Sequence, residues 1–238
     1  MPMSLRRPGR RVMTDSSAMA ELRLWQLISP ALPVGAYAYS AGLETAIATG
    51  WVNDTERLQQ WVAGQLDAGL AGLDLPILRR LHQGWAQGDD QAVAIWTARL
   101  LASRESAELR AEDVHIGRAL ARLLNSLGVE EAAVLDRRSA VSFATAFALA
   151  AHAWAIPVDA ACRGYAWAWC ENQVAAAVKL IPLGQSDGQR VLAAIAEAIP
   201  AAVESATARP DEDIGATTPG LGIASSWHET QYTRLFRS

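Results

Sequence analysis

A run of uncharged residues near the middle of the chain is the feature that most restricts the fold. Residues 139–158 contain no aspartate, glutamate, lysine or arginine, and a helix of that length is long enough to cross a bilayer. The run is mostly alanine, however, with serine, threonine and histidine included and Pro157 near its end. We therefore expect a central helix packed on all sides within a bundle, where small side chains let neighbouring helices approach closely.

The rest of the chain also predicts helices. Alanine, leucine, glutamine, glutamate and arginine dominate, and no segment shows the sustained apolar–polar alternation with β-branched residues that a strand needs. Glycine, proline and capping residues divide the pattern into segments. The expected helices span residues 19–29, 40–49, 54–70, 74–87, 89–103, 106–127, 137–155, 159–180 and 187–206.

Short connections between these helices favour one all-α domain, a bundle of about eight to ten helices over residues 19–207. Residues 1–18 form a basic leader that we expect to be disordered, because no apolar segment follows its arginines as it would in an export signal. Residues 208–238 form a partly flexible tail, loop-like at first and then rich in aromatic, apolar and cationic side chains. Such an ending predicts a segment that docks, against its own domain or a partner.

Composition narrows the possible functions. The net charge is -4 and the pI is near 5.6, which argues against a nucleic-acid-binding protein. Cys162 and Cys170 lie eight residues apart, too far for a disulfide within one helix, and fit a reducing cytoplasm. We find no nucleotide-binding loop and no nucleophile elbow. We therefore predict no catalytic residue and no cofactor.

The histidines do not form a metal-binding pattern. They are scattered over different segments, and only one has an acidic residue at helical spacing, Glu112 three positions before it. We predict no metal site. The four histidines are His82, His115, His152 and His228.

The segment 29–44 is the most distinctive connection between helices. Pro30 and Pro33 end the helix that precedes it, because proline lacks the amide hydrogen that a helix interior needs. Ser40 is placed to cap the next helix, and Glu44 lies in the first turns of that helix, near the positive end of its dipole. The loop displays two tyrosines, Tyr37 and Tyr39. From the residues alone, the pattern in this segment is equally well explained by a buried connection between two helices.

Outside this segment, Lys179 is the charged residue that we single out. It lies near the end of an apolar helix, where a cation favours the negative end of the dipole. The alanine-rich approach suggests in addition that its stem is buried and its ammonium group points into a polar region. Glu44 is the candidate counter-charge, and the two residues are our candidate functional pair.

Three stretches of the chain together resemble the UreF family of urease accessory proteins. They are the loop 29–44 with its Leu-Pro-Val-Gly and Ser-x-Gly-Leu-Glu elements, the segment 174–185, and the terminal His-Glu-Thr-Gln-Tyr-Thr-Arg-Leu-Phe-Arg-Ser. Their order and spacing match the family, as does the run at 100–113. The resemblance covers residues 20–238, which leaves only the basic leader outside it.

The resemblance implies an all-helical, often dimeric protein without chemistry of its own. UreF-like proteins bridge UreD, also called UreH, and the GTPase UreG, in a complex that binds apo-urease and delivers nickel to it. They are proposed to modulate the GTPase. We accordingly expect a cytoplasmic homodimer, with no nucleic-acid or membrane partner. The expected partner-binding residues are Tyr37, Tyr39, Ser40, His228, Tyr232, Arg234, Leu235 and Phe236, with Tyr37 near Arg234 in the dimer.

Two other classes of function stay open at this point. One is a helical enzyme whose site is assembled from Glu44, His115 and Lys179. The other is a general helical adaptor that has no role in nickel delivery. Purification with candidate partners distinguishes these hypotheses from a UreF-like function. An enzyme would bind a small molecule on its own, whereas a UreF-like protein requires a stable complex with UreD.

Overall fold

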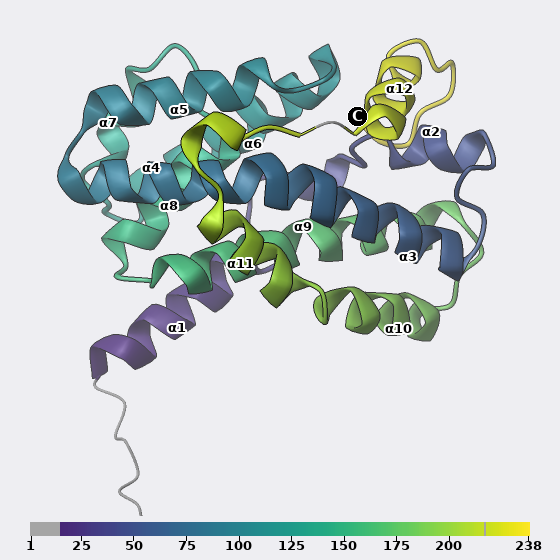
Figure 1. Cartoon of the computed structure of the whole chain (residues 1–238), viewed down its shortest axis with the longest axis horizontal. Coiled ribbons are helices and arrows are strands. Elements are labelled where there is room, and N and C mark those ends of the chain that lie inside the picture. Colours follow the sequence, from purple (N-terminus) through teal and green to yellow (C-terminus); the bar gives the residue numbers. More distant parts are fainter. Residues whose placement is uncertain (1–14, 217) are drawn as a thin grey trace, which may run out of the picture.

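The protein is an all-α bundle, as the sequence predicts (Figure 1). The computed structural model describes residues 15–216 and 218–238, and within these ranges it contains helices and connecting loops but no strand. The α-helices are α1 Asp15–Ile28, α2 Leu43–Ala48, α3 Thr55–Gly64, α4 Leu75–Gln87, α5 Asp90–Ala102, α6 Ala107–Ser126, α7 Ala132–Asp136, α8 Phe143–Ala153, α9 Val158–Leu180, α10 Gln185–Ala196, α11 Ile199–Ala208 and α12 Pro219–His228. Three further elements are the 3₁₀ turns η1 Ala36–Ala38 and η3 Asp211–Asp213 and the π-helical segment η2 Gln65–Asp74.

Helix α8 lies at the centre of the core, which confirms the interpretation of the uncharged run. Every residue from 144 to 151 is buried, and α8 packs mainly against α4 and α6. The helix begins at Phe143 rather than at the predicted residue 137, because Ser142 caps it by accepting a hydrogen bond from the Thr145 amide at 3.1 Å. Gly117 of α6 contacts the backbone just before α8, so the two helices approach very closely there.

Helices α3 and α4 form one rod across the molecule, where the sequence predicts two separate helices (Figure 1). The π-helical segment η2 joins them. Pro76, at the start of α4, lacks an amide hydrogen and its ring would clash with the carbonyl of Gly72 in a regular helix. The wider π turn relieves this conflict, and the Gly72 carbonyl accepts a hydrogen bond from the Gly215 amide at 3.0 Å instead.

The C-terminal third differs from the prediction in two places. The expected helix 187–206 is divided between α10 and α11 at residues 197–198, just before Pro200. The first part of the segment 208–238, expected to be loop-like, contains α12, with Pro219 at its first position, where proline is well tolerated. The short helix α7, in the segment after α6, is also absent from the prediction.

At the other end, α1 begins at Asp15, four residues before the predicted start. The leader predicted over 1–18 lies outside the described residues as far as residue 14, and the remainder forms the first turn of α1. This helix packs against α9, where Gly164 leaves room for Leu24.

One described stretch, Gln185–Ala208, is long and apolar enough to cross a membrane by length and composition alone. It is the stretch that divides into α10 and α11, and 39% of its most apolar window is buried inside the protein. Core helices of soluble proteins pass the same test, so this is weak support for a membrane span.

Candidate docking site at the C-terminal tail

The end of the chain lies against the loop 29–44, so two of the distinctive sequence segments meet in space. The Arg237 amide donates to the Ala38 carbonyl at 2.8 Å, and the Ser40 amide donates to the Ser238 carbonyl at 3.0 Å. Ala41, directly after Ser40, has a positive φ of 49°, a conformation that a non-glycine residue adopts only where its surroundings hold it. We call residues 229–238 the tail.

Glu44 holds the tail through its backbone. This carboxylate is only 6% exposed, and it accepts hydrogen bonds from the amides of Leu235 at 2.7 Å and Phe236 at 2.9 Å. Helix α2 begins at Leu43 rather than at the predicted residue 40, but the Ser40 hydroxyl still accepts a hydrogen bond from the Glu44 amide at 3.2 Å. The two hydrogen bonds from the tail amides to the Glu44 carboxylate are charge-assisted, and such bonds are among the stronger ones in proteins.

A fully buried histidine connects Glu44 to a second carboxylate. His228, the last residue of α12, has Nε2 3.2 Å from Glu44 and Nδ1 2.6 Å from Glu108 of α6. A neutral imidazole carries a single N–H, so only the doubly protonated ring donates to both carboxylates. Glu108 also accepts a hydrogen bond from Arg234 at 2.8 Å. His228 and Arg234 thus both contact the carboxylates of Glu44 and Glu108, so each of these polar side chains has a partner, as buried polar groups require. We call these four residues the tail clamp.

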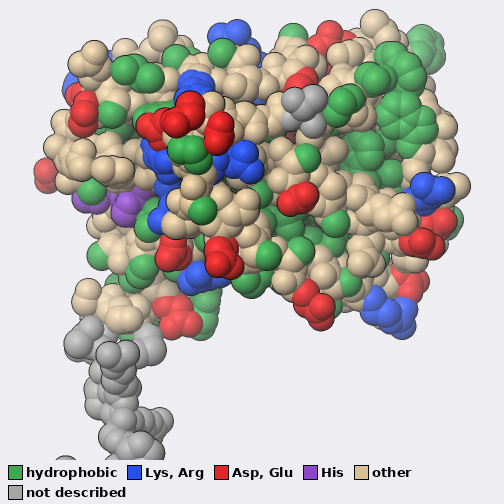
Figure 2. All heavy atoms as spheres, in the orientation of Figure 1, with side chains coloured by type: hydrophobic (Ala, Val, Ile, Leu, Met, Phe, Trp, Pro, Cys, Tyr) green, Lys and Arg blue, Asp and Glu red, His purple; other side chains and the backbone are tan. Residues whose placement is uncertain are grey.

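The side chains of the tail face in two directions. Phe236 and Ser238 are buried, whereas Tyr232 is 103% and Leu235 64% exposed. Nearby, the rings of Trp51 and Trp227 are in contact, with centres 5.4 Å apart and planes tilted by 53°, although both side chains are exposed. Hydrophobic side chains gather on this upper right part of the surface, over α2 and α12 (Figure 2). We use the name tail face for the exposed apolar side chains of α12 and the tail together with Trp51, which contacts Trp227; they are Trp51, Ile223, Trp227, Tyr232 and Leu235.

Lys179 does not have the environment that the sequence suggested. Its side chain is exposed rather than buried, and its ammonium nitrogen lies 5.5 Å from the centre of the Phe236 ring, a cation–π contact. The counter-charges of Glu44 are the tail amides and His228, so the prediction that Glu44 pairs with Lys179 is wrong. Both residues contact Phe236 instead: Glu44 accepts a hydrogen bond from its backbone amide, and Lys179 lies over its ring.

The two loop tyrosines have different surroundings. Tyr39 is buried, and its hydroxyl lies 3.2 Å from Nδ1 of His115. Tyr37 is 67% exposed and is free to contact another molecule. The structure therefore assembles Glu44, His228, Arg234 and Phe236 in one place, whereas His115 has a separate partner. The proposed enzyme site of Glu44, His115 and Lys179 is not brought together by these contacts.

A second group of buried charges was missed by the sequence analysis. Arg104 forms ion pairs with Asp74 at 2.6 Å and Asp113 at 2.8 Å, and the Tyr165 hydroxyl donates to Asp74 at 3.3 Å. Burial acts to lower the pKa of Arg104, but the two aspartates raise it well above its ordinary value. These residues come from η2, the loop between α5 and α6, α6 and α9, so no local sequence pattern indicates that they meet.

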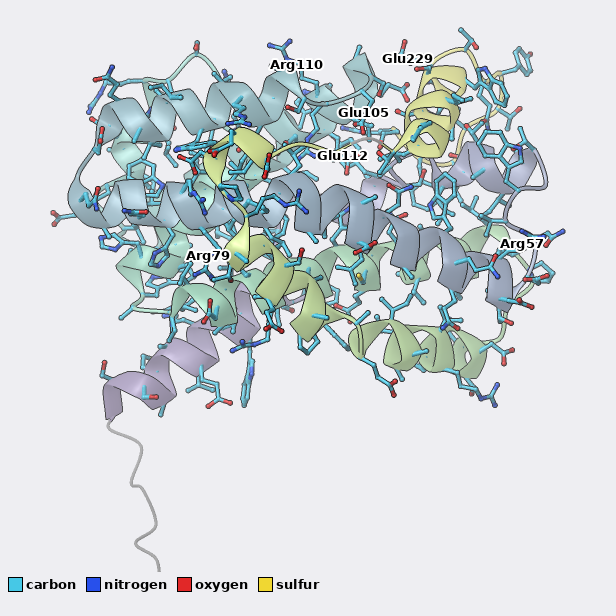
Figure 3. The ribbon with its side chains drawn as sticks, viewed as in Figure 1. Arg57, Arg79, Glu105, Arg110, Glu112 and Glu229 are labelled. Carbon is cyan, nitrogen blue, oxygen red and sulfur yellow. The ribbon has the colours of Figure 1, made fainter. Side chains whose placement is uncertain are left out.

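The Arg104 group lines an interior cavity of about 140 Å³. Glu105 and Glu112 also line it, and both lie between the α3–α4 rod and α12 in Figure 3. Burial raises the pKa of Glu112 to about 7, against the opposing effect of a hydrogen bond from the Ser238 hydroxyl at 2.5 Å. The tail therefore touches one wall of the cavity as well as the clamp.

Metal ligation has little support in the part of the chain that the structure describes. No group of three or more histidine, cysteine, aspartate or glutamate side chains is arranged there to hold a metal ion. Cys162 and Cys170 are both buried and free.

The matching family model and the similar known proteins carry the same family name. A family model described as UreF matches residues 52–196. The protein named urease accessory protein UreF from Alkalilimnicola ehrlichii is 51% identical over 220 residues, which cover 92% of this chain and 96% of the relative. Relatives of the same name from Azoarcus sp. and Chromohalobacter salexigens are 50% and 47% identical, covering 91% and 90% of this chain and 95% and 93% of their own. The similarity thus spans most of the chain.

Proposed function

Because this chain belongs to the UreF family of urease accessory proteins, we propose that it is a non-catalytic adaptor in urease maturation that works in the cytoplasm. In this role it bridges UreD and the GTPase UreG and modulates GTP-dependent nickel delivery to apo-urease. Nickel is cargo in this scheme rather than a resident cofactor.

The observation that carries the proposal is the two-sided arrangement of the tail. Its backbone is held by Glu44, and Phe236 is buried beneath it, whereas Tyr232 and Leu235 project outward. A cluster of large, exposed apolar side chains is typical of a protein-docking site. Aromatic and arginine side chains are also the usual anchors of such interfaces, and Tyr232 and Arg234 fit that description. We assign the tail face to UreD.

The test is co-purification with UreD. A Tyr232→Ala, Leu235→Ala double variant removes the two outward side chains and leaves the clamp intact, so we expect a folded protein that elutes without UreD. Ile95→Ala is the matched control, because Ile95 is an exposed apolar residue of α5; this variant should keep the complex. Normal UreD binding by the double variant would show that the tail face is not the docking site.

We further propose that the protein is a homodimer and that Tyr37 contributes to its interface. The support is the exposure of this tyrosine on a loop stiffened by two prolines. A Tyr37→Ala variant that sediments with the same mass as the wild-type protein would contradict this assignment.

A further inference from the structure

Two histidines outside the tail clamp lie side by side at the opposite end of the bundle. His82 of α4 and His152 in the last turn of α8 have ring centres 6.1 Å apart and planes at 87°. They are distant in the sequence, and the packing of α4 against α8 brings them together. Both are half-buried. Histidine side chains appear as one purple patch on the left of the surface in Figure 2, where α4 and α8 lie.

The distance between the rings fits a shared metal ion. A nitrogen ligand lies about 2.0–2.1 Å from a metal such as Zn²⁺, which places each ring centre roughly 3.2 Å from the ion. Two imidazoles on one ion then have centres about 5.2 Å apart at a tetrahedral angle and about 6.4 Å apart when they are opposite. The observed 6.1 Å lies within that span. The spacing of the two rings is therefore compatible with ligation of one ion by both imidazoles.

The protonation state of His82 favours ligation. Burial lowers its pKa, and the nearby His152 and Arg79 lower it further. A neutral imidazole has one free lone pair, which is the form that binds a metal. The backbone at Ile156 acts in the opposite direction and raises the pKa of His82, but burial is the larger effect.

The neighbouring charged and sulfur-containing groups are already engaged. Arg79, labelled on the left of Figure 3, forms an ion pair with Asp159, which compensates its positive charge. Burial raises the pKa of the Cys162 thiol to about 11, so this sulfur stays protonated at neutral pH and is a poor ligand. The protein therefore offers two imidazoles.

We propose that His82 and His152 form a binding site for one divalent transition-metal ion of the class that prefers imidazole, such as Ni²⁺, Cu²⁺ or Zn²⁺. Water completes the coordination, because the described residues contain no larger cluster of potential ligands. The site is separate from the tail face, so it does not depend on the proposed docking of UreD.

Equilibrium dialysis of the untagged full-length protein against Ni²⁺ and against Zn²⁺ tests the site. We expect one bound ion in the wild-type protein and a loss of affinity of at least about tenfold in His82→Gln and in His152→Gln, the lower end of what is seen when even a supporting residue of a metal site is changed. His115→Gln is the control, since His115 is an exposed histidine on α6. Equal affinity in all four proteins would overturn the proposal.

Electron paramagnetic resonance with Cu²⁺ provides a second measurement that uses the wild-type protein and remains informative if a variant folds poorly. We expect the spectrum to show two equatorial imidazole nitrogens from separate rings, and the same spectrum in His115→Gln. A wild-type spectrum with one imidazole or none would refute the site whatever the dialysis shows.

Discussion

Glu44 brings a negative charge into a nearly dry part of the molecule, and its hydrogen-bond donors come from residues 191 and 192 positions further along the chain. The sequence motif identifies the residue as unusual, because an acidic side chain follows a stiff loop at a helix start. Its partners are backbone amides and a histidine near the C-terminus, and neither kind of donor leaves a local sequence signal. The prediction therefore located the residue correctly and chose the wrong counter-charge, Lys179.

Lys179 and Glu44 give a prediction about nickel delivery, because both contact Phe236 or its backbone beside the tail. We expect Lys179→Ala and Glu44→Gln to assemble with UreD and UreG but to yield urease that contains less nickel, measured by metal analysis of the matured enzyme. Arg190→Ala is the control, since Arg190 is an exposed cation of α10 that pairs with Asp187 of the same helix. Full nickel occupancy with both variants would leave these residues a purely structural role.

Glu112 predicts a pH dependence of stability. Its pKa is about 7 in the folded protein and near 4.5 when unfolded, so between these values the unfolded chain releases a proton that the folded chain keeps. Fewer protons on the unfolded state mean that the free energy of unfolding falls as pH rises through this window.

We test this by urea unfolding of the wild-type protein and Glu112→Gln at pH 4.5, 6 and 7.5. Glutamine does not titrate, so the stability of the wild-type protein relative to the variant should fall as pH rises. A difference between the two proteins that stays constant, or that grows in favour of the wild type, would show that the carboxylate is not held protonated by burial.

The existence of the buried helix α8 could be predicted from the sequence, whereas α12 could not, for physical reasons. A helix buried on every side excludes charge all round, and this leaves a signal in the sequence itself. Helix α12 is composed largely of glycine, serine, alanine and proline, which favour loops in isolation, and packing against α2 stabilises it instead. The π-helical segment η2 was missed because its cause is a clash of Pro76 with a carbonyl one turn earlier.

The crossing of α6 and α8 gives a prediction about packing. A Cβ atom at Gly117 would overlap the backbone at residues 141–142, with the Ser142 carbonyl oxygen 2.6 Å away. Backbone cannot move aside cheaply, so we expect Gly117→Ala to destabilise the fold by roughly 2–4 kcal/mol, in the upper part of the range for single substitutions.

Gly64→Ala is the matched control for this crossing. Gly64 has ordinary helical dihedral angles, and a Cβ there meets no atom within 4 Å. Alanine should therefore stabilise the fold by up to about 1 kcal/mol. Chemical denaturation measures both variants, and similar stabilities would mean that the two helices do not pack as closely as described.

At the scale of the whole molecule, the tail joins the C-terminal end of the chain to a segment near its N-terminal end. Residues 235–238 contact the loop before α2, and His228 and Arg234 contact α6, so three distant segments of the chain share one set of charges. Phe236 of the tail joins the hydrophobic core, but most of that core is built from α4, α6, α8, α9 and the other helices. We infer that the bundle folds without the tail and that the clamp adds stability only when the tail is present.

A double-mutant cycle tests this coupling between tail and bundle. In the full-length chain, Glu44→Gln replaces an acceptor of two amide hydrogen bonds with a group that carries its own N–H hydrogens, and we expect a loss of about 2–3 kcal/mol. In a chain that ends at Glu229 those amides are gone, so the same substitution should lower stability by less than about 1 kcal/mol, which reflects the remaining contact with His228. Gly117→Ala should cause the same loss in both chains, because its contacts lie in the core. An equal loss from Glu44→Gln with and without the tail would mean that this carboxylate serves the bundle alone and does not hold the tail.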